Sequence, residues 1–183
     1  MRRPLVSAAL GFVLVLVLGV VGLACGGAVK RPDGGVGLLP VGAAAPDLVG
    51  KNGAGNEVRL STQRGKAAVV YFYPQDETPG CTKEACAFRD AWKQLEASGV
   101  TVFGVSVNSE ERHRAFQKEH NLPFPLVADE QGNAATAYGV PHRLWGYDRV
   151  SFLVDRDGKV AKVWPDVDPA IHAREVIDAA SHL

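Results

Sequence analysis

The chain has 183 residues with 20 basic and 20 acidic side chains, so its formal net charge is zero. This length accommodates one domain with a sizeable hydrophobic core and some appended segments. The balanced charge, without a cluster of Lys and Arg, argues against a nucleic-acid partner. The 3 cysteines are too few for a disulfide-rich scaffold, so any cysteine chemistry is local.

The N-terminus has the layout of an export signal. Arg2 and Arg3 precede an uncharged apolar stretch that ends at Cys25. A basic start, an apolar centre and a small residue before the cleavage point are typical of secretory signals. The segment "VGLAC" also resembles a bacterial lipoprotein box, although Gly22 stands where Leu is usual. This resemblance implies a signal peptide of about residues 1–24 and lipidation of Cys25.

Two forms of this N-terminal segment (1–25) remain open. A lipoprotein would be held by a lipid on Cys25, which we favour, whereas an uncleaved segment would cross the membrane, since about 20 apolar residues span a bilayer. In both cases the arginines stay inside and the folded domain faces outward. We therefore expect an exported protein, periplasmic or on the outer face, that is anchored to the membrane. The Gly-rich residues 26–41 are expected to form a flexible tether.

Residues 42–183 have the pattern of an α/β domain. The continuous apolar run "AAVVYFY" (67–73) predicts a strand that is buried on both faces. Apolar residues recur at intervals of three and four over 82–97, which predicts a helix. A second buried strand is predicted at 100–107.

Strands and helices continue to alternate toward the C-terminus. Ser109 is expected to cap the N-terminus of a helix whose first turn carries two glutamates. A short strand is predicted at 124–129, and strands at 150–155 and 159–164 form a hairpin around an Asp-Gly turn. An amphipathic helix (169–182) closes the chain. This order predicts a thioredoxin-like fold, with a central mixed sheet, helices on both faces and an N-terminal extension.

Two cysteines lie five residues apart in "PQDETPGCTKEAC". Cys81 stands where a strand has ended and a helix begins, and a thiol there meets free backbone N–H groups that favour the thiolate. On a regular helix the Cα atoms of Cys81 and Cys86 are about 8.7 Å apart, beyond the ~7 Å limit for a disulfide. Either the segment is never helical and holds a permanent disulfide, or the helix unwinds when the bond forms. The helical periodicity that follows favours the second alternative.

No metal site or other cofactor is expected. There is no second cysteine pair, and none of the 5 histidines stands at ligand spacing to this one. The histidines are expected on the solvent-facing surface, and no role is assigned to them.

The residues around Cys81 resemble a known family. Pro74 and Thr78 precede it in the pattern P-x-x-x-T-x-x-C, and "FRD" (88–90) follows. Together with "DRVSFLVDRDGKV" near the end, this is similar to peroxiredoxins of the Q type, or bacterioferritin comigratory proteins, in the alkyl hydroperoxide reductase/thiol-specific antioxidant family. The resemblance runs from about Gly42 to the C-terminus. It implies a thiol-dependent peroxidase that reduces hydrogen peroxide and organic hydroperoxides.

The resemblance makes Cys81 the peroxidatic cysteine and Cys86 the resolving cysteine. Attack of the Cys81 thiolate on a hydroperoxide leaves a sulfenic acid. Condensation with Cys86 then gives an intramolecular disulfide, the atypical 2-Cys route. The implied partner is a thioredoxin-like protein that reduces this disulfide, and we expect the peroxidase to be a monomer.

The resemblance also assigns four residues around the thiol. The Thr78 hydroxyl hydrogen-bonds the thiolate and the peroxide, and Pro74 limits the access of water to the sulfur. Arg149 matches the arginine that stabilises the thiolate and the charge on the breaking O–O bond. Glu84 occupies the position that orients this arginine. Arg89, from the "RD" pair of this branch, is expected to form an ion pair on the helix face.

The stretch before the active-site arginine leaves two alternatives open. Trp145 and Tyr147 either line the peroxide entrance or pack against the domain. Most members of this family are cytosolic, so an exported member implies a membrane-linked or periplasmic reductant.

Two other functions are weighed against the peroxidase. An exported thiol–disulfide oxidoreductase of the same fold would carry CxxC and a cis-Pro before the hairpin strand, where this chain has CxxxxC and Asp148-Arg149. A non-enzymatic lipoprotein with a relic fold is disfavoured, because Pro74, Thr78, Cys81 and Arg149 are all intact.

Overall fold

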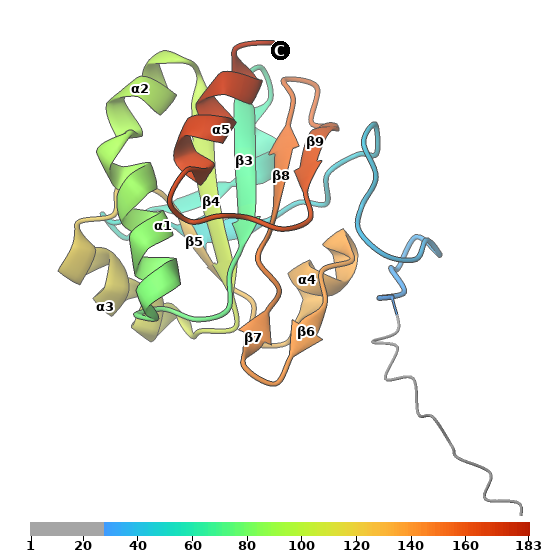
Figure 1. The fold of residues 1–183 in the computed structure, drawn as a ribbon, viewed down its shortest axis with the longest axis horizontal. Helices are drawn as coiled ribbons and strands as arrows, with labels where there is room; N and C mark the ends of the chain where they lie inside the picture. Colours follow the sequence, from blue (N-terminus) through green and yellow to red (C-terminus); the bar gives the residue numbers. More distant parts are fainter. Residues whose placement is uncertain (1–27) are drawn as a thin grey trace, which may run out of the picture.

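The structure, a computed structural model, describes residues 28–183 (Figure 1). The predicted signal peptide and Cys25 lie outside the described residues. Within the described part, no helix combines the length and apolar character needed to cross a bilayer. The described chain folds around a central mixed sheet that helices cover on both faces, as predicted.

The sheet has seven strands in the order β2-β1-β5-β4-β3-β8-β9. At its centre, β3 (Ala67–Phe72) runs parallel to β4 (Val100–Ser106) and antiparallel to β8 (Val150–Val154). On one side β4 pairs in parallel with β5 (Leu126–Ala128), and on the other β8 pairs antiparallel with β9 (Val160–Trp164). Because β3 and β4 are covered on both faces, they read as continuous apolar runs in the sequence.

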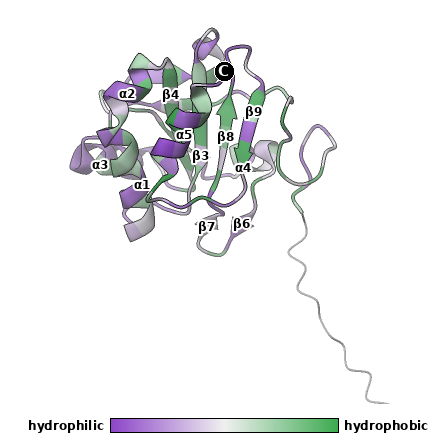
Figure 2. Cartoon of the chain, turned by 45° about the horizontal axis from the view of Figure 1, so that its top comes forward, coloured by the Kyte–Doolittle hydropathy of each residue, from purple (hydrophilic) through white to green (hydrophobic). Residues whose placement is uncertain are grey.

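Two hydrophobic clusters lie on the two faces of the sheet. Side chains of β3 alternate between them: Val69 and Tyr71 belong to one cluster, and Val70 and Phe72 belong to the other. The first cluster is closed by α1 (Pro79–Asp90), α2 (Trp92–Ala97), α3 (Glu110–His120) and α5 (His172–Ala180), and the second by α4 (Asn133–Tyr138). In Figure 2 the central strands are hydrophobic, whereas the outer faces of the helices are hydrophilic.

The predicted helix over 82–97 is two helices in the structure. α1 begins earlier, at Pro79, where proline is well suited to the first helical position because its missing N–H would have no partner. α1 ends at Asp90, and Ala91 (φ −85°, ψ 0°) separates it from α2. The prediction of one helix was therefore wrong, because a single residue leaves the helix while the apolar spacing continues across it.

The other predicted elements are present, and their ends shift by at most three residues. Ser109 caps α3 as predicted, since its Oγ accepts a hydrogen bond from the Arg112 N–H. Several elements of at most six residues are too short to show a period and were not predicted. They are α4, β1 (Val49–Lys51), β2 (Glu57–Arg59), the 3-10 helix η1 (Leu60–Gln63), β6 (His142–Arg143) and β7 (Gly146–Tyr147).

In residues 28–41, the described part of the predicted tether, Gly37 and Leu39 contact the domain at α4. Leu39 is buried in the second cluster, and its N–H donates to the Tyr138 carbonyl oxygen at 2.9 Å. Arg31 is also buried and donates to the carbonyl oxygens of Gly37 and Leu38. The domain core thus receives Leu39 from this segment, while most of its other residues are exposed.

The small β6–β7 hairpin contacts the segment that follows β3. Gly146, the first residue of β7, has φ of +113°, and a Cβ atom there would overlap the Pro74 carbonyl oxygen. Glycine is therefore required at this position for two reasons: the positive φ, and the close approach of the Pro74 backbone. The contact ties the hairpin to the start of the cysteine-containing segment.

We expect Gly146→Ala to lower the free energy of unfolding by about 2–4 kcal/mol, because it adds a strained φ to a backbone overlap. Urea denaturation measures this loss. Gly55→Ala is the matched control, since Gly55 also has a positive φ (+81°) but open space where a Cβ would lie. That variant should lose about 1 kcal/mol. Equal losses in the two variants would show that the contact with Pro74 contributes nothing.

Candidate active site

Cys81 lies in the first turn of α1 and is only 1% exposed. β3 ends at Phe72, and the loop that follows leads to Thr78, the extended residue before the helix. The first turn of a helix has backbone N–H groups without helical partners, and these favour an anionic group. These N–H groups lie beside the Cys81 side chain, whose thiolate is the nucleophilic form.

Arg149 brings a positive charge to the Cys81 sulfur. It lies directly before β8, the neighbour of β3, and its Nη2 is 3.2 Å from the Cys81 Sγ. A Cβ at Gly80 would lie 3.2 Å from the same Nη2, so glycine leaves room for the guanidinium. The sequence-predicted cysteine and arginine, 68 residues apart, thus meet in the structure.

Glu84 neutralises this arginine inside the protein. Its side chain is fully buried, and its Oε2 accepts a hydrogen bond from Arg149 Nη1. Burial opposes the charge on Arg149, but Glu84 and Cys81 outweigh this effect, so the pKa of the guanidinium is raised. The arginine therefore stays charged and keeps a fixed orientation toward the sulfur.

His172, at the start of α5, completes this cluster. Its Nδ1 is 2.8 Å from Glu84 Oε1, and both side chains are fully buried. The expectation that the histidines face solvent was therefore wrong for this residue. The signal that would have found it is helical spacing, since His172 lies four residues before the buried Val176 and so shares its face of the helix.

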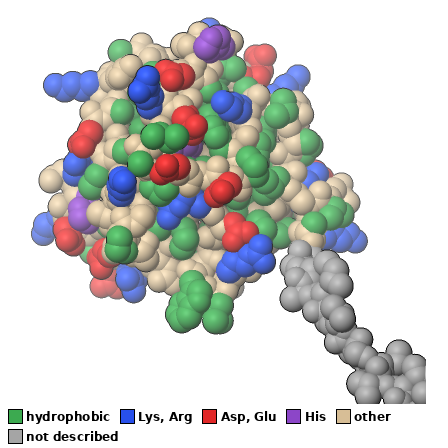
Figure 3. All heavy atoms as spheres, viewed as in Figure 1, with side chains coloured by type: hydrophobic (Ala, Val, Ile, Leu, Met, Phe, Trp, Pro, Cys, Tyr) green, Lys and Arg blue, Asp and Glu red, His purple; other side chains and the backbone are tan. Residues whose placement is uncertain are grey.

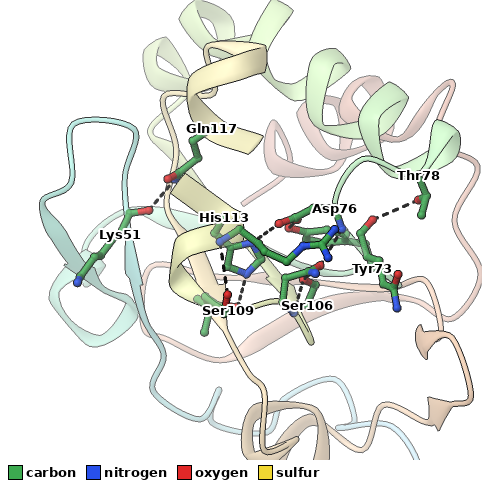
Figure 4. A network of polar contacts seen from close by, with 12 residues as sticks. Lys51, Tyr73, Asp76, Thr78, Ser106, Ser109, His113 and Gln117 are labelled. Atoms are coloured by element: carbon green, nitrogen blue, oxygen red, sulfur yellow. Dashed lines mark hydrogen bonds and ion pairs between the residues drawn. The ribbon is translucent and has the colours of Figure 1, made fainter. Parts of the chain in front are cut away.

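A second buried cluster fixes the loop between β3 and α1 (Figure 4). Tyr73 donates its O–H to Asp76 Oδ1 at 2.7 Å, and His113 Nδ1 lies 2.9 Å from Asp76 Oδ2. The Asp76 N–H donates to Asn108 Oδ1 at 2.8 Å. Burial, with Tyr71 and Asp76 adding to it, raises the pKa of Tyr73 well above its ordinary value, so Tyr73 stays a hydrogen-bond donor.

His113 in this cluster is also buried, which again contradicts the solvent-facing expectation. Its Nε2 lies 3.1 Å from the Val127 carbonyl oxygen, so both ring nitrogens face oxygen acceptors. The two contacts join Asp76 in the loop and Val127 at β5 through one side chain of α3.

Thr78 and Pro74 flank this loop. The Thr78 hydroxyl donates to the Gln75 carbonyl oxygen at 3.2 Å and does not cap α1. Pro74 is half-buried, and its backbone lies against Gly146. Both residues are therefore held near the start of α1 through loop and hairpin contacts.

Cys86 is half-buried, lies on the same helix as Cys81, and both thiols are free. Because α1 is continuous through the two cysteines, the alternative of a permanent disulfide in a non-helical segment does not fit the structure. Arg89 forms the expected ion pair with Asp90 and also donates to the His120 carbonyl oxygen. The bond to Asp90, with Cys86 contributing, raises the pKa of Arg89.

The turn between β6 and β7 projects from the surface (Figure 3). Leu144 is 86% exposed and Trp145 is 76% exposed. Trp145 therefore does not pack against the domain, and its place at the peroxide entrance stays a prediction. Tyr147 is buried and donates its O–H to the Asp129 carbonyl oxygen at 2.6 Å, so for this residue the packing alternative is confirmed.

Residues 28–183 contain no group of three His, Cys, Asp or Glu side chains arranged to hold a metal ion. The chemistry that this arrangement supports is nucleophilic attack by a buried thiolate, with a fixed guanidinium beside the sulfur.

Residues 41–163 match the AhpC/TSA family. The chain is 39% identical over 152 residues to the peroxiredoxin Bcp of Bacillus subtilis, covering 79% of this chain and 97% of that protein. It is 42% identical over 145 residues to the chloroplastic peroxiredoxin Q of Sedum lineare, covering 78% of each.

Two solved structures are also similar to this fold. The peroxidoxin BcpB of Mycobacterium tuberculosis matches with a TM-score of 0.71 and 28% identity, covering 79% of this chain and 98% of that chain. Peroxiredoxin Q of Xanthomonas campestris matches with a TM-score of 0.68 and 30% identity, covering 74% of this chain and 90% of that chain.

We expect His113→Leu to lower the free energy of unfolding by about 1–3 kcal/mol, because it leaves Asp76 Oδ2 buried without its hydrogen-bond partner. Urea denaturation of the two single variants and the double variant measures this. Asp76→Asn combined with His113→Leu should be more stable than His113→Leu alone, since an amide costs less to bury without a partner than a carboxyl group does. A double variant that is less stable than His113→Leu would show that the contact between Asp76 and His113 does not account for the loss.

Proposed function

Because the chain belongs to the AhpC/TSA family, as a peroxiredoxin of the Q or Bcp branch, we propose that Cys81 is the residue that attacks the hydroperoxide. The protein is a thiol-dependent peroxidase. The observation that carries the assignment of Cys81 is its contact with Arg149, at 3.2 Å from Nη2 to Sγ. The arginine beside Cys86 is instead Arg89 of the same helix, which is paired with Asp90.

The first step consumes the hydroperoxide. The Cys81 thiolate attacks the terminal peroxide oxygen, an S–O bond forms and the O–O bond breaks. The sulfur is oxidised to the sulfenic acid, and the leaving oxygen takes up a proton to give an alcohol, or water from hydrogen peroxide. Arg149 stabilises the negative charge as it moves from sulfur to the leaving oxygen.

Thr78 and Pro74 shape the place where the peroxide reacts. The Thr78 hydroxyl both donates and accepts, so on binding it can leave Gln75 and bridge the thiolate and the peroxide oxygen. Pro74 has no N–H group and restricts the access of water to the sulfur. Glu84 orients Arg149 through the hydrogen bond described above.

The second step joins the two cysteines. The Cys86 thiol attacks the Cys81 sulfur, an S–S bond forms, and the sulfenic oxygen leaves as water after protonation. Cα atoms five residues apart on a helix are about 8.7 Å apart, which exceeds the reach of a disulfide. The first turns of α1 must therefore unwind after the sulfenic acid forms.

A dithiol protein completes the cycle. Thiol–disulfide exchange returns Cys81 and Cys86 to thiols while the donor is oxidised to its own disulfide. We propose a thioredoxin-like donor and a monomeric peroxidase. Since the sequence predicts an export signal ahead of the domain, we propose that the donor is a membrane-linked or periplasmic protein.

We expect Cys81→Ser to abolish reaction with hydrogen peroxide, because the nucleophile is lost. Cys86→Ser should react once and then stop turning over, because no resolving thiol remains. Stopped-flow fluorescence of Trp92, on α2 beside α1, follows the first step, and NADPH consumption through thioredoxin and its reductase follows turnover. Reduction of insulin without consumption of peroxide would instead support a thiol–disulfide oxidoreductase.

We further propose that the exported protein is held at the membrane through Cys25. Mass spectrometry of the purified mature protein should find an N-terminal, lipid-modified Cys25, because the residues before it have the pattern of a signal peptide. Cys25→Ser should prevent this modification. An unmodified chain that still begins at Met1 would contradict the lipoprotein and support the retained membrane helix.

A further inference from the structure

A continuous line of contacts runs from the reactive sulfur to α5. Cys81 Sγ contacts Arg149 Nη2, Arg149 Nη1 donates to Glu84 Oε2, and Glu84 Oε1 lies 2.8 Å from His172 Nδ1. Each carboxylate oxygen of Glu84 therefore has a different partner. The peroxidase chemistry proposed above uses the first three residues and leaves His172 without a role.

His172 contacts Glu84 through only one of its two ring nitrogens. Its Nδ1 faces the carboxylate, while its buried Nε2 has no hydrogen-bond partner among residues 28–183. The rest of the ring makes apolar contacts, edge-on to Phe88 (centroids 5.1 Å apart) and to Trp164 (5.5 Å). The Nδ1–H is therefore the polar group by which this side chain holds Glu84, and the apolar contacts only enclose it.

Glu84 is also the residue that must move before resolution. It lies on α1 between Cys81 and Cys86, within the turns that must unwind for the two sulfurs to meet. Unwinding these turns withdraws the carboxylate from Arg149 and from His172 together. α5 itself is fixed through Ala173 and Val176, which are buried in the first hydrophobic cluster. Because α5 is fixed, the hydrogen bond between His172 and Glu84 opposes the unwinding of α1.

We propose that His172 is a positioning residue for peroxide reduction, whose Nδ1–H holds Glu84 and so keeps α1 wound and Arg149 at Cys81 until the sulfenic acid has formed. This inference rests on the proposed function of Cys81 and Cys86. It predicts opposite effects on two successive steps. Losing the Nδ1–H slows attack on peroxide, since Arg149 is less well oriented, and speeds disulfide formation, since α1 unwinds more easily.

Two substitutions separate the hydrogen bond from the packing. His172→Leu keeps the apolar contacts with Phe88 and Trp164 but has no donor. His172→Asn places an N–H donor close to the position of Nδ1 and gives up most of the ring contacts. A purely structural role predicts that the asparagine variant is the more damaged, whereas a positioning role predicts that the leucine variant is.

The experiment is stopped-flow fluorescence of the full-length protein mixed with hydrogen peroxide. In His172→Leu, the second-order rate constant for peroxide should fall about 10-fold and the first-order rate of disulfide formation should rise about 10-fold, as expected for loss of a hydrogen bond to a charged group. His172→Asn should stay within about 3-fold of the unaltered protein in both rates. Mass spectrometry at excess peroxide should find less sulfinic acid on Cys81 in the leucine variant, because the sulfenic acid is resolved sooner.

The inference is overturned if His172→Leu leaves both rates unchanged, if both rates fall together, or if His172→Asn is impaired as strongly as the leucine variant. Urea denaturation reports whether each variant is folded, and His172→Phe, which retains a ring without a donor, replaces the leucine variant if that does not fold. Failure of the proposed function has a different signature, because the unaltered protein would then form no sulfenic acid on Cys81.

Discussion

The buried carboxylate of Glu84 is the constraint on which the site depends. A charge without solvent is tolerated only where partners compensate it fully. Arg149 and His172 provide that compensation from the approach to β8 and from the start of α5. Because the carboxylate lies on α1, three separate parts of the chain must be correctly placed at once. The same requirement brings the guanidinium to the Cys81 sulfur.

Two buried polar clusters hold the chain on either side of Cys81. Asp76 is fixed to His113 on α3 within the loop, and Glu84 is fixed to His172 on α5 within the helix. Cys81 lies between these points of attachment. The loop that carries Pro74 and Thr78 is thereby held independently of α1, so unwinding of the helix need not disturb the loop.

The sequence predicts the parts of this protein whose signal is local. The buried strands show as apolar runs, the apolar periodicity after Cys81 predicts a helix, and Arg149 is found through a family motif. His113 and His172 were missed because a histidine alone carries no sign of its burial, and their acidic partners lie 37 and 88 residues away. The break at Ala91 was missed because the spacing of apolar residues continues unchanged across a single non-helical residue.

The break at Ala91 has a consequence for the resolving step that we propose. α2 begins at Trp92, and Leu95 on it is fully buried in the first hydrophobic cluster. Since Ala91 already leaves the helix, α2 does not depend on hydrogen bonds from the first turns of α1. Unwinding at Cys81 can therefore stop within α1, while α2 remains packed against β4. The cost of bringing Cys86 to Cys81 is then confined to one helix and to the two hydrogen bonds of Glu84.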